Sequence, residues 1–155
     1  MSEQNSTQTR VDQGLLLLRL GGGAFMAFSH GLPKLLAFSE KAAHFADPLH
    51  IGPVASFGLA TGAEFVGALL VLVGFFTRPA AAAVLFTMLV AGLVQHAGDP
   101  WNKKELALLF ALVFGTLLTT GPGALSVDAW LKRRRDRLKE RPESATREVA
   151  SQSVV

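Results

Sequence analysis

Residues 54–97 of this 155-residue chain read VASFGLATGAEFVGALLVLVGFFTRPAAAAVLFTMLVAGLVQHA, and this stretch decides the fold. It holds two long apolar segments, 54–76 and 79–97, which are separated only by Thr77 and Arg78. A hydrocarbon core about 30 Å thick is crossed by roughly 20 helical residues, so each segment is long enough. The proline that opens the second segment suits the first turn of a helix. The sequence therefore predicts two transmembrane helices that are antiparallel neighbours.

The composition of the whole chain also favours a membrane protein. Hydrophobic residues make up 50% of the chain and charged residues only 17%, whereas a soluble domain carries about 25% charged residues. Two more apolar segments, 14–36 and 106–125, flank the central pair. Trp101 and Trp130 bracket the last segment, as aromatic side chains at the two membrane interfaces do. We therefore expect an all-α integral membrane protein, with a four-helix bundle as its one domain at 14–130.

The two ends of the chain differ from this domain in composition. Residues 1–13 are polar, and we expect them to be disordered. Residues 132–148 hold eight Lys and Arg against four Asp and Glu, so the net charge of +3 arises in the tail. We expect the basic tail at 131–155 to contact anionic lipid and to be disordered after about Pro142. Because the positive charge is confined to this tail, a nucleic-acid-binding domain is disfavoured.

The distribution of Lys and Arg predicts the orientation in the membrane. If both termini lie on one side, that side holds ten of these residues outside the spans and the other side holds three. Because cytoplasmic loops carry the excess of positive residues, we expect both termini in the cytoplasm. The chain has no cysteine, which excludes disulfides, thiolate metal sites and thiol redox chemistry by the chain itself.

Ionisable residues inside the predicted spans are the candidates for a functional site. Each costs roughly 3 kcal/mol at the centre of a bilayer, so such residues usually face the interior of a bundle. Counted from the predicted helix ends, five of them gather in the outer half of the membrane: His30, Lys34, Glu64, His96 and Glu105. Glu64 lies about 15 Å below the outer surface, near the midplane. We expect Lys34 or His30 to compensate its charge.

Other polar residues have a structural interpretation as well as a functional one. Lys34, His96 and Glu105 also fit side chains that simply reach the interface. Three charged residues belong to the inner side: Arg19, Arg78 and Asp128. We expect Arg19 and Asp128 to form a structural pair or to contact lipid headgroups. On the third helix, one face is shared by Thr87, Ala91 and Gln95.

Several of these residues occur in motifs that resemble those of the DoxX family. The resemblance is carried by HGLPKL at 30–35, EFVGALLVLVGFFTRPAA at 64–81, the histidine that ends the third helix, NKKELAL at 102–108 and GPGALSVD at 121–128. It covers about residues 14–130. The resemblance implies a multi-pass protein of four helices in the bacterial cytoplasmic (inner) membrane.

The resemblance also implies quinone-linked redox chemistry. The family takes its name from a subunit of a terminal quinol oxidase and thiosulfate:quinone oxidoreductase. We therefore expect a quinone-linked oxidoreductase, or a membrane subunit that joins a protein partner in an oxidoreductase complex. His30, Lys34 and Glu64 would form the catalytic pocket, with His96 and Glu105 at its mouth. Arg19, Arg78 and Asp128 are weaker binding candidates.

Other functions remain open at this point. The sequence has no nucleotide-binding, hydrolase or zinc-protease motif, and no metal site is predicted. A haem held by His30 and His96 is a weaker alternative to a quinone. The chain could also be a non-catalytic membrane anchor or assembly factor, or a small transporter or lipid-binding protein that uses the same pocket. A quinone bound to the purified protein would favour the redox function over these alternatives.

Overall fold

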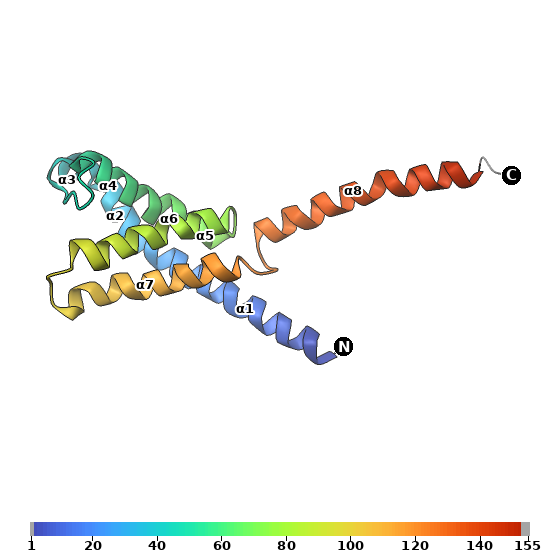
Figure 1. Ribbon diagram of the computed structural model, residues 1–155, viewed down its shortest axis with the longest axis horizontal. Coiled ribbons are helices and arrows are strands. Elements are labelled where there is room, and N and C mark those ends of the chain that lie inside the picture. Colours follow the sequence, from blue (N-terminus) through green and yellow to red (C-terminus); the bar gives the residue numbers. More distant parts are fainter. Residues whose placement is uncertain (1, 153–155) are drawn as a thin grey trace.

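The computed structural model describes the backbone of residues 2–152 and the side chains of residues 3–139, and its regular elements over that range are all helical (Figure 1). The first long segment comprises α1 (Ser2–Ala24), the π-helix η1 (Phe25–Gly31) and α2 (Leu32–Leu36). Two short elements follow, α3 (Phe38–Lys41) and the 3-10 helix η2 (Ala42–His44). The second and third long segments comprise α4 (Pro53–Gly62), η3 (Ala63–Gly67) and α5 (Ala68–Val73), then α6 (Thr77–Leu89) and η4 (Val90–Gln95). The last two helices are α7 (Trp101–Thr120) and α8 (Val127–Gln152).

Three helical segments of the described chain are long and apolar enough to cross a membrane: Glu3–Leu36, Pro53–Val73 and Thr77–Gln95. Helix α7 has 20 residues, but three charged residues lie near its start, Lys103, Lys104 and Glu105, and it is not among the three. The all-α class predicted from the sequence is therefore confirmed, with three candidate spans, while a fourth span stays a prediction.

Packing of the helices buries a core of small and medium-sized side chains. Helices α6 and α7 lie side by side as a hairpin, and α1 contacts both α5 and α7 (Figure 1). Fully buried residues come from each of these helical segments, among them Met26, Val71, Val84, Phe114 and Leu117. Helix α8 extends away from this core, at the end where the N-terminal part of α1 also extends (Figure 1).

The turn between the second and third segments lies at 74–76, slightly before the predicted Thr77-Arg78. Gly74 has a φ of 76°. Its N–H group donates hydrogen bonds to the carbonyls of Leu70 and Val71, and α5 ends at this point. Left-handed backbone of this kind is the usual conformation just after a helix and favours glycine. Because the turn is so short, α5 and α6 are neighbours, as the sequence predicts.

A glycine in the first segment allows an especially close helix contact. A Cβ on Gly31 would lie 2.6 Å from backbone atoms of Glu64 and Phe65. The backbones of η1 and η3 therefore touch, in the way that small residues permit at transmembrane helix interfaces. This contact fixes the position of Glu64 relative to the first segment.

Both ends of the chain differ from the disorder predicted from the sequence. Residues 2–13 continue α1 as helix, and Asp12 gives a reason: its side chain is buried, and its Oδ1 accepts a hydrogen bond from the N–H of Ala124 at 2.8 Å. This bond ties the polar segment to the loop before α8. In the tail, α8 continues beyond Pro142 to Gln152. Residues 1 and 153–155, and the side chain of Arg141, lie outside the described residues.

Candidate functional site

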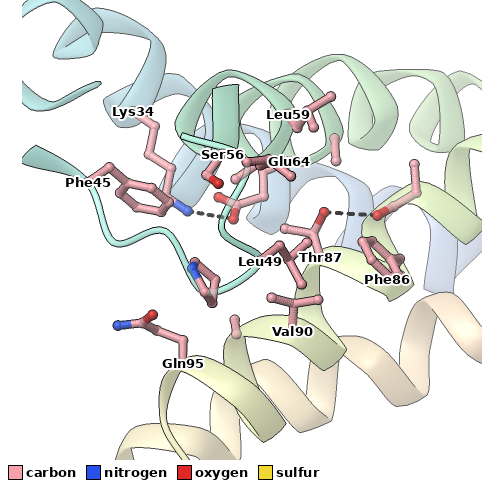
Figure 2. A pocket seen from close by; sticks show the side chains of 16 residues that line it. Lys34, Phe45, Leu49, Ser56, Leu59, Glu64, Phe86, Thr87, Val90 and Gln95 are labelled. Atoms are coloured by element: carbon pink, nitrogen blue, oxygen red, sulfur yellow. Dashed lines mark hydrogen bonds and ion pairs between the residues drawn. The ribbon is translucent and has the colours of Figure 1, made fainter. Parts of the chain in front are cut away.

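An apolar cavity of about 330 Å³ lies between the second and third helical segments (Figure 2). Helix α4 and η3 form one wall, α6 and η4 form the other, and the loop at 45–51 covers it. Most of the lining is apolar, and the polar side chains at the wall are Lys34, Ser56, Glu64, Thr87 and Gln95. Small-molecule sites have volumes of about 300–1,000 Å³ and combine apolar walls with a few polar groups. The cavity fits that description.

An ion pair lies at the cavity wall. Lys34 Nζ lies 2.5 Å from Glu64 Oε1, and Figure 2 shows the ammonium and the carboxylate pointing toward each other. The Lys34 side chain is 30% exposed, whereas that of Glu64 is only 2% exposed. Of the two residues expected to compensate Glu64, Lys34 is therefore the one that does so. A buried pair of this kind needs further hydrogen bonds to offset the loss of solvation.

The second carboxylate oxygen of Glu64 lacks such a bond. Among the described side chains, Glu64 Oε2 is buried and has no hydrogen-bond partner. Thr61 Oγ1, one helical turn earlier, is likewise buried without a partner. Buried polar atoms are almost always paired, and an unpaired one costs about 1–3 kcal/mol. The carboxylate of Glu64 can therefore accept a hydrogen bond that the protein itself does not supply.

Three π-helical segments surround this site. Glu64 lies in η3, Val90, Ala91 and Gln95 of η4 line the cavity, and η1 packs against η3. At the end of η4 the N–H of His96 donates to the carbonyl of Ala91 at 3.0 Å, five residues back. π-Helical turns are rare and occur often at functional sites. The presence of three π-helical segments in neighbouring helices therefore favours a functional site in this part of the protein.

The covering loop is held by one aspartate. Asp47 accepts hydrogen bonds from the hydroxyl of Ser56 at 2.6 Å and from the N–H groups of Gly52 at 2.7 Å and Ile51 at 3.0 Å. The Ser56 hydrogen bond, followed by the backbone hydrogen bonds, lowers the pKa of Asp47 below its usual value. Phe45 packs on Phe57 with 4.8 Å between ring centroids. The loop is therefore fixed to the start of α4.

The other three residues of the predicted outer site do not line the cavity. His30 packs edge-on against Phe110 of α7, with 5.4 Å between ring centroids. His96 Nδ1 lies 2.7 Å from Asp99 Oδ2 in the following loop, and this hydrogen bond lowers the pKa of Asp99. Glu105 is exposed on α7. His30 and Lys34, which the sequence predicts on one helical face, contact different helical segments: His30 lies against α7 and Lys34 against η3.

The residues that the sequence predicts on the inner side join three parts of the chain. Arg19 is buried and donates to the carbonyls of Pro122 at 2.5 Å and Leu125 at 3.0 Å. Asp128 instead accepts hydrogen bonds from the N–H of Phe76 and from the N–H and hydroxyl of Thr77, at 2.9–3.0 Å. The expected Arg19–Asp128 ion pair is thus absent from the described residues.

Arg78 also lies at this end of the helical core. It is exposed, and its guanidinium donates to the carbonyl of Thr119 at 3.3 Å. Hydrogen bonds of these three side chains link the first segment, the turn at 74–76 and the loop at 121–126. They have a structural role, and none of the three residues, Arg19, Arg78 and Asp128, lines the cavity.

Sequence reasoning identified two of the polar wall residues as site candidates and missed three. Thr87 and Gln95 were visible as a stripe with Ala91, and all three line the cavity. Ser56 and the covering loop gave no such signal, because the path of a loop cannot be read from hydropathy. Within the described residues, no group of three or more His, Asp and Glu side chains could hold a metal ion.

Comparisons with known proteins identify the family. The sequence profile of the DoxX family matches residues 14–97. Inner membrane protein YphA of Escherichia coli strain K12 is 31% identical over 111 residues, which are 63% of this chain and 76% of that protein. An uncharacterized protein of Haemophilus influenzae is 32% identical over 116 residues, 68% of this chain and 81% of that protein. No solved structure matches the chain at a significant level. Because the profile covers more than half of the sequence, this chain belongs to the DoxX family.

Proposed function

We propose that this protein crosses the bacterial inner membrane four times, with both termini in the cytoplasm, and binds a lipid-soluble quinone. It would act as a quinone-linked oxidoreductase or as the membrane subunit of an oxidoreductase complex. The name of the E. coli relative, inner membrane protein, supports the location. The excess of Lys and Arg on the side of the termini supports the orientation. The N-terminal part of α1 and helix α8 also extend from the same end of the helical core (Figure 1).

Helix α7 is the proposed fourth span. Its 20 residues are about 30 Å long, enough for a hydrocarbon core. Its charged residues lie in the first turns, next to the exposed Trp101, where an interface would solvate them. Farther along, Phe114 is buried against the other helices, while Leu112 is 68% exposed, as for a side chain that faces lipid.

The observation that carries the quinone proposal is the buried carboxylate of Glu64 at the wall of an apolar cavity. A quinone has an apolar body and oxygen atoms that need hydrogen bonds, so it suits apolar walls with few polar groups. Leu59 and Phe86 line the cavity and are 66% and 58% exposed. The cavity therefore reaches the lipid-facing surface, which gives an isoprenoid tail a path into the bilayer.

The chain's own residues would bind the ring and handle its protons. A bound quinone supplies two-electron redox chemistry and takes up two protons when it is reduced. Glu64, as an ionised carboxylate, would accept a hydrogen bond at Oε2 from a ring hydroxyl, and Lys34 would keep the carboxylate in position through Oε1. The apolar side chains and the covering loop exclude water. Because the chain contains no cysteine, we propose that a partner protein supplies or accepts the electrons.

A cavity-filling variant tests this proposal. Ala83 lines the cavity from an exposed position on α6, so Ala83→Trp should fill the cavity without disturbing the core. Ala55 is an exposed residue of α4 that does not line the cavity, and Ala55→Trp is the matched control. Decylubiquinone titrated into the protein in nanodiscs should bind wild type and the control alike, and Ala83→Trp at least about tenfold more weakly.

Four results would overturn the quinone proposal. Absence of decylubiquinone binding by the wild type would do so, as would equal binding by Ala83→Trp. Co-purification of the wild type with phospholipid in the cavity, which decylubiquinone does not displace, would favour the lipid-binding alternative. Co-purification with a soluble enzyme while the protein binds no quinone would favour an anchor or assembly factor.

The basic tail is proposed to contact anionic lipid. The side chains of 132–139 are exposed, and the guanidinium of Arg134 lies 5.6 Å from the Trp130 ring, which places a cation beside an interfacial aromatic residue. Each such charge is worth about 1 kcal/mol near an anionic surface, and salt weakens it. A tail peptide of residues 127–152 should bind vesicles that contain phosphatidylglycerol and not neutral ones. Equal binding to both would contradict the proposal.

A further inference from the structure

We infer that the cavity binds the reduced, hydroxyl-bearing quinol more tightly than the oxidised quinone, and that Glu64 Oε2 is the atom that discriminates between them. This inference rests on the proposed function, since it specifies which form of the ligand the same site prefers.

The preference for one form of the ligand follows from the hydrogen-bonding capacity of Glu64. An ionised carboxylate has four lone-pair positions and no hydrogen to donate. Lys34 satisfies Oε1, at 2.5 Å, while Oε2 is buried without a donor. A ligand that satisfies Oε2 must therefore supply an O–H or N–H group. The hydroxyl of a quinol can do so, whereas the carbonyl of a quinone would place a second acceptor against the carboxylate.

The neighbouring hydroxyl groups do not reverse this preference. The hydroxyl of Ser56 donates to Asp47 at 2.6 Å, and that of Thr87 donates to the carbonyl of Ala83 at 3.0 Å. Each hydroxyl has one hydrogen, so neither is free to donate to a quinone carbonyl. Both oxygen atoms can still accept a hydrogen bond. These two groups therefore also favour a ligand that donates.

The remaining polar groups do not discriminate. Gln95 carries an amide, which can donate or accept. The ammonium of Lys34 has further hydrogens, but it can donate to the oxygen of a hydroxyl as well as to that of a carbonyl. Figure 2 shows both side chains at the edge of the space into which Glu64 points. Discrimination between the two forms therefore depends on the groups that can only accept, and among these the carboxylate is the charged and strongest acceptor.

The expected difference in affinity follows from the strength of the bond. A hydrogen bond to a charged group is strong enough to change an affinity by about tenfold or more. For a two-electron couple, a tenfold tighter binding of the reduced form raises the reduction potential of the bound couple by about 30 mV. The protein would thus hold its ligand in the reduced state more readily than the free membrane pool does.

The test compares three ligands of nearly the same shape: decylubiquinone, decylubiquinol and the dimethyl ether of decylubiquinol. Wild-type protein in nanodiscs should bind the quinol about tenfold more tightly than the quinone. It should also bind the quinol more tightly than the ether, which has no hydrogen to donate. A potentiometric titration of the bound couple should show the corresponding upward shift. Equal affinities, or tighter binding of the quinone or of the ether, would overturn the inference.

A variant assigns the effect to Glu64. In Glu64→Gln the amide can donate to a carbonyl, so the preference for the quinol should fall to about threefold or less. Retention of the full preference in this variant would overturn the role of Glu64. If the variant does not fold, the comparison of three ligands on wild type still decides. If wild type binds quinone and quinol equally and Ala83→Trp loses the binding of both, the result would support the proposed function and overturn only the preference for the quinol.

Discussion

Replacement of Gly31 by alanine should destabilise the protein more than any other single methyl group added to the first segment. The added Cβ would lie 2.6 Å from three backbone atoms of Glu64 and Phe65, where ordinary contacts are about 3.5–4 Å. Backbone atoms cannot rotate away, so η1 and η3 must separate by about 1 Å. Overpacking of this kind costs about 1–3 kcal/mol, and we expect about 3 kcal/mol because the clash involves backbone on both sides.

Gly21→Ala is the matched control for this change. It lies in the same helical segment, and a Cβ there has nothing within 4 Å, so it should leave the free energy of unfolding unchanged or raise it slightly. Unfolding is measured by circular dichroism in mixed micelles of dodecylmaltoside and sodium dodecyl sulfate. Gly31→Ala should also weaken ligand binding, because it displaces Glu64. If the two variants unfold within about 0.5 kcal/mol of each other, the close contact of η1 and η3 is refuted.

Three further predictions concern the covering loop, the inner end and the topology. The pKa of Asp47 is lowered in the folded protein. The ionised carboxylate therefore stabilises the fold at pH values above the pKa of an unfolded aspartate, about 3.9. This stabilisation is lost as the pH falls through the lower pKa of Asp47 in the folded protein. The stability difference between wild type and Asp47→Asn should therefore be constant from about pH 7 to 5 and shrink below about pH 4; a difference that grows in acid would contradict this. Asp128→Ala removes the acceptor for the N–H groups of Phe76 and Thr77 at the start of α6 and should lower the free energy of unfolding by about 2 kcal/mol. Asp136→Ala, an exposed control on α8, should change it little. Equal free energies of unfolding for the two variants would refute the capping role of Asp128. For the topology, single cysteines are placed at Ser6, Ala46, Gly98 and Ser151. An impermeant maleimide added to intact cells should label only positions 46 and 98. Labelling of position 151 would contradict the proposed cytoplasmic location of the C-terminus.

The helical class and the first three apolar helices could be predicted because hydropathy acts over whole segments. The sequence places apolar residues at 14–36, 54–76 and 79–97, and the structure has long helices through each of them. The short connection at 77–78 likewise predicted that the second and third segments are neighbours. The fourth segment is less apolar at its start, because of Lys103, Lys104 and Glu105.

The candidate site could be predicted only in part. Depth from the helix ends was enough to predict that Glu64 lies near Lys34, because the sequence predicts that their helices are antiparallel. It did not predict that His30 packs against Phe110 of α7 instead of lining the cavity, because the partner of a side chain depends on how the helices pack. The bond from the backbone N–H of Ala124 to the side chain of Asp12, which links the N-terminal segment to the loop before α8, also gave no signal in the sequence. Contacts of this kind depend on the tertiary fold and not on the local sequence.

We propose the cavity between the second and third helical segments as the quinone site. Photoaffinity labelling with an azidoquinone, followed by mass spectrometry of peptides, tests it most directly. Labelling should fall on residues 45–51, 59–64 and 83–95, which contain nearly all of the cavity lining, and excess decylubiquinone should suppress it. Labelling confined to α7 or to the lipid-facing side of α1, or labelling that excess decylubiquinone leaves unchanged, would contradict the account.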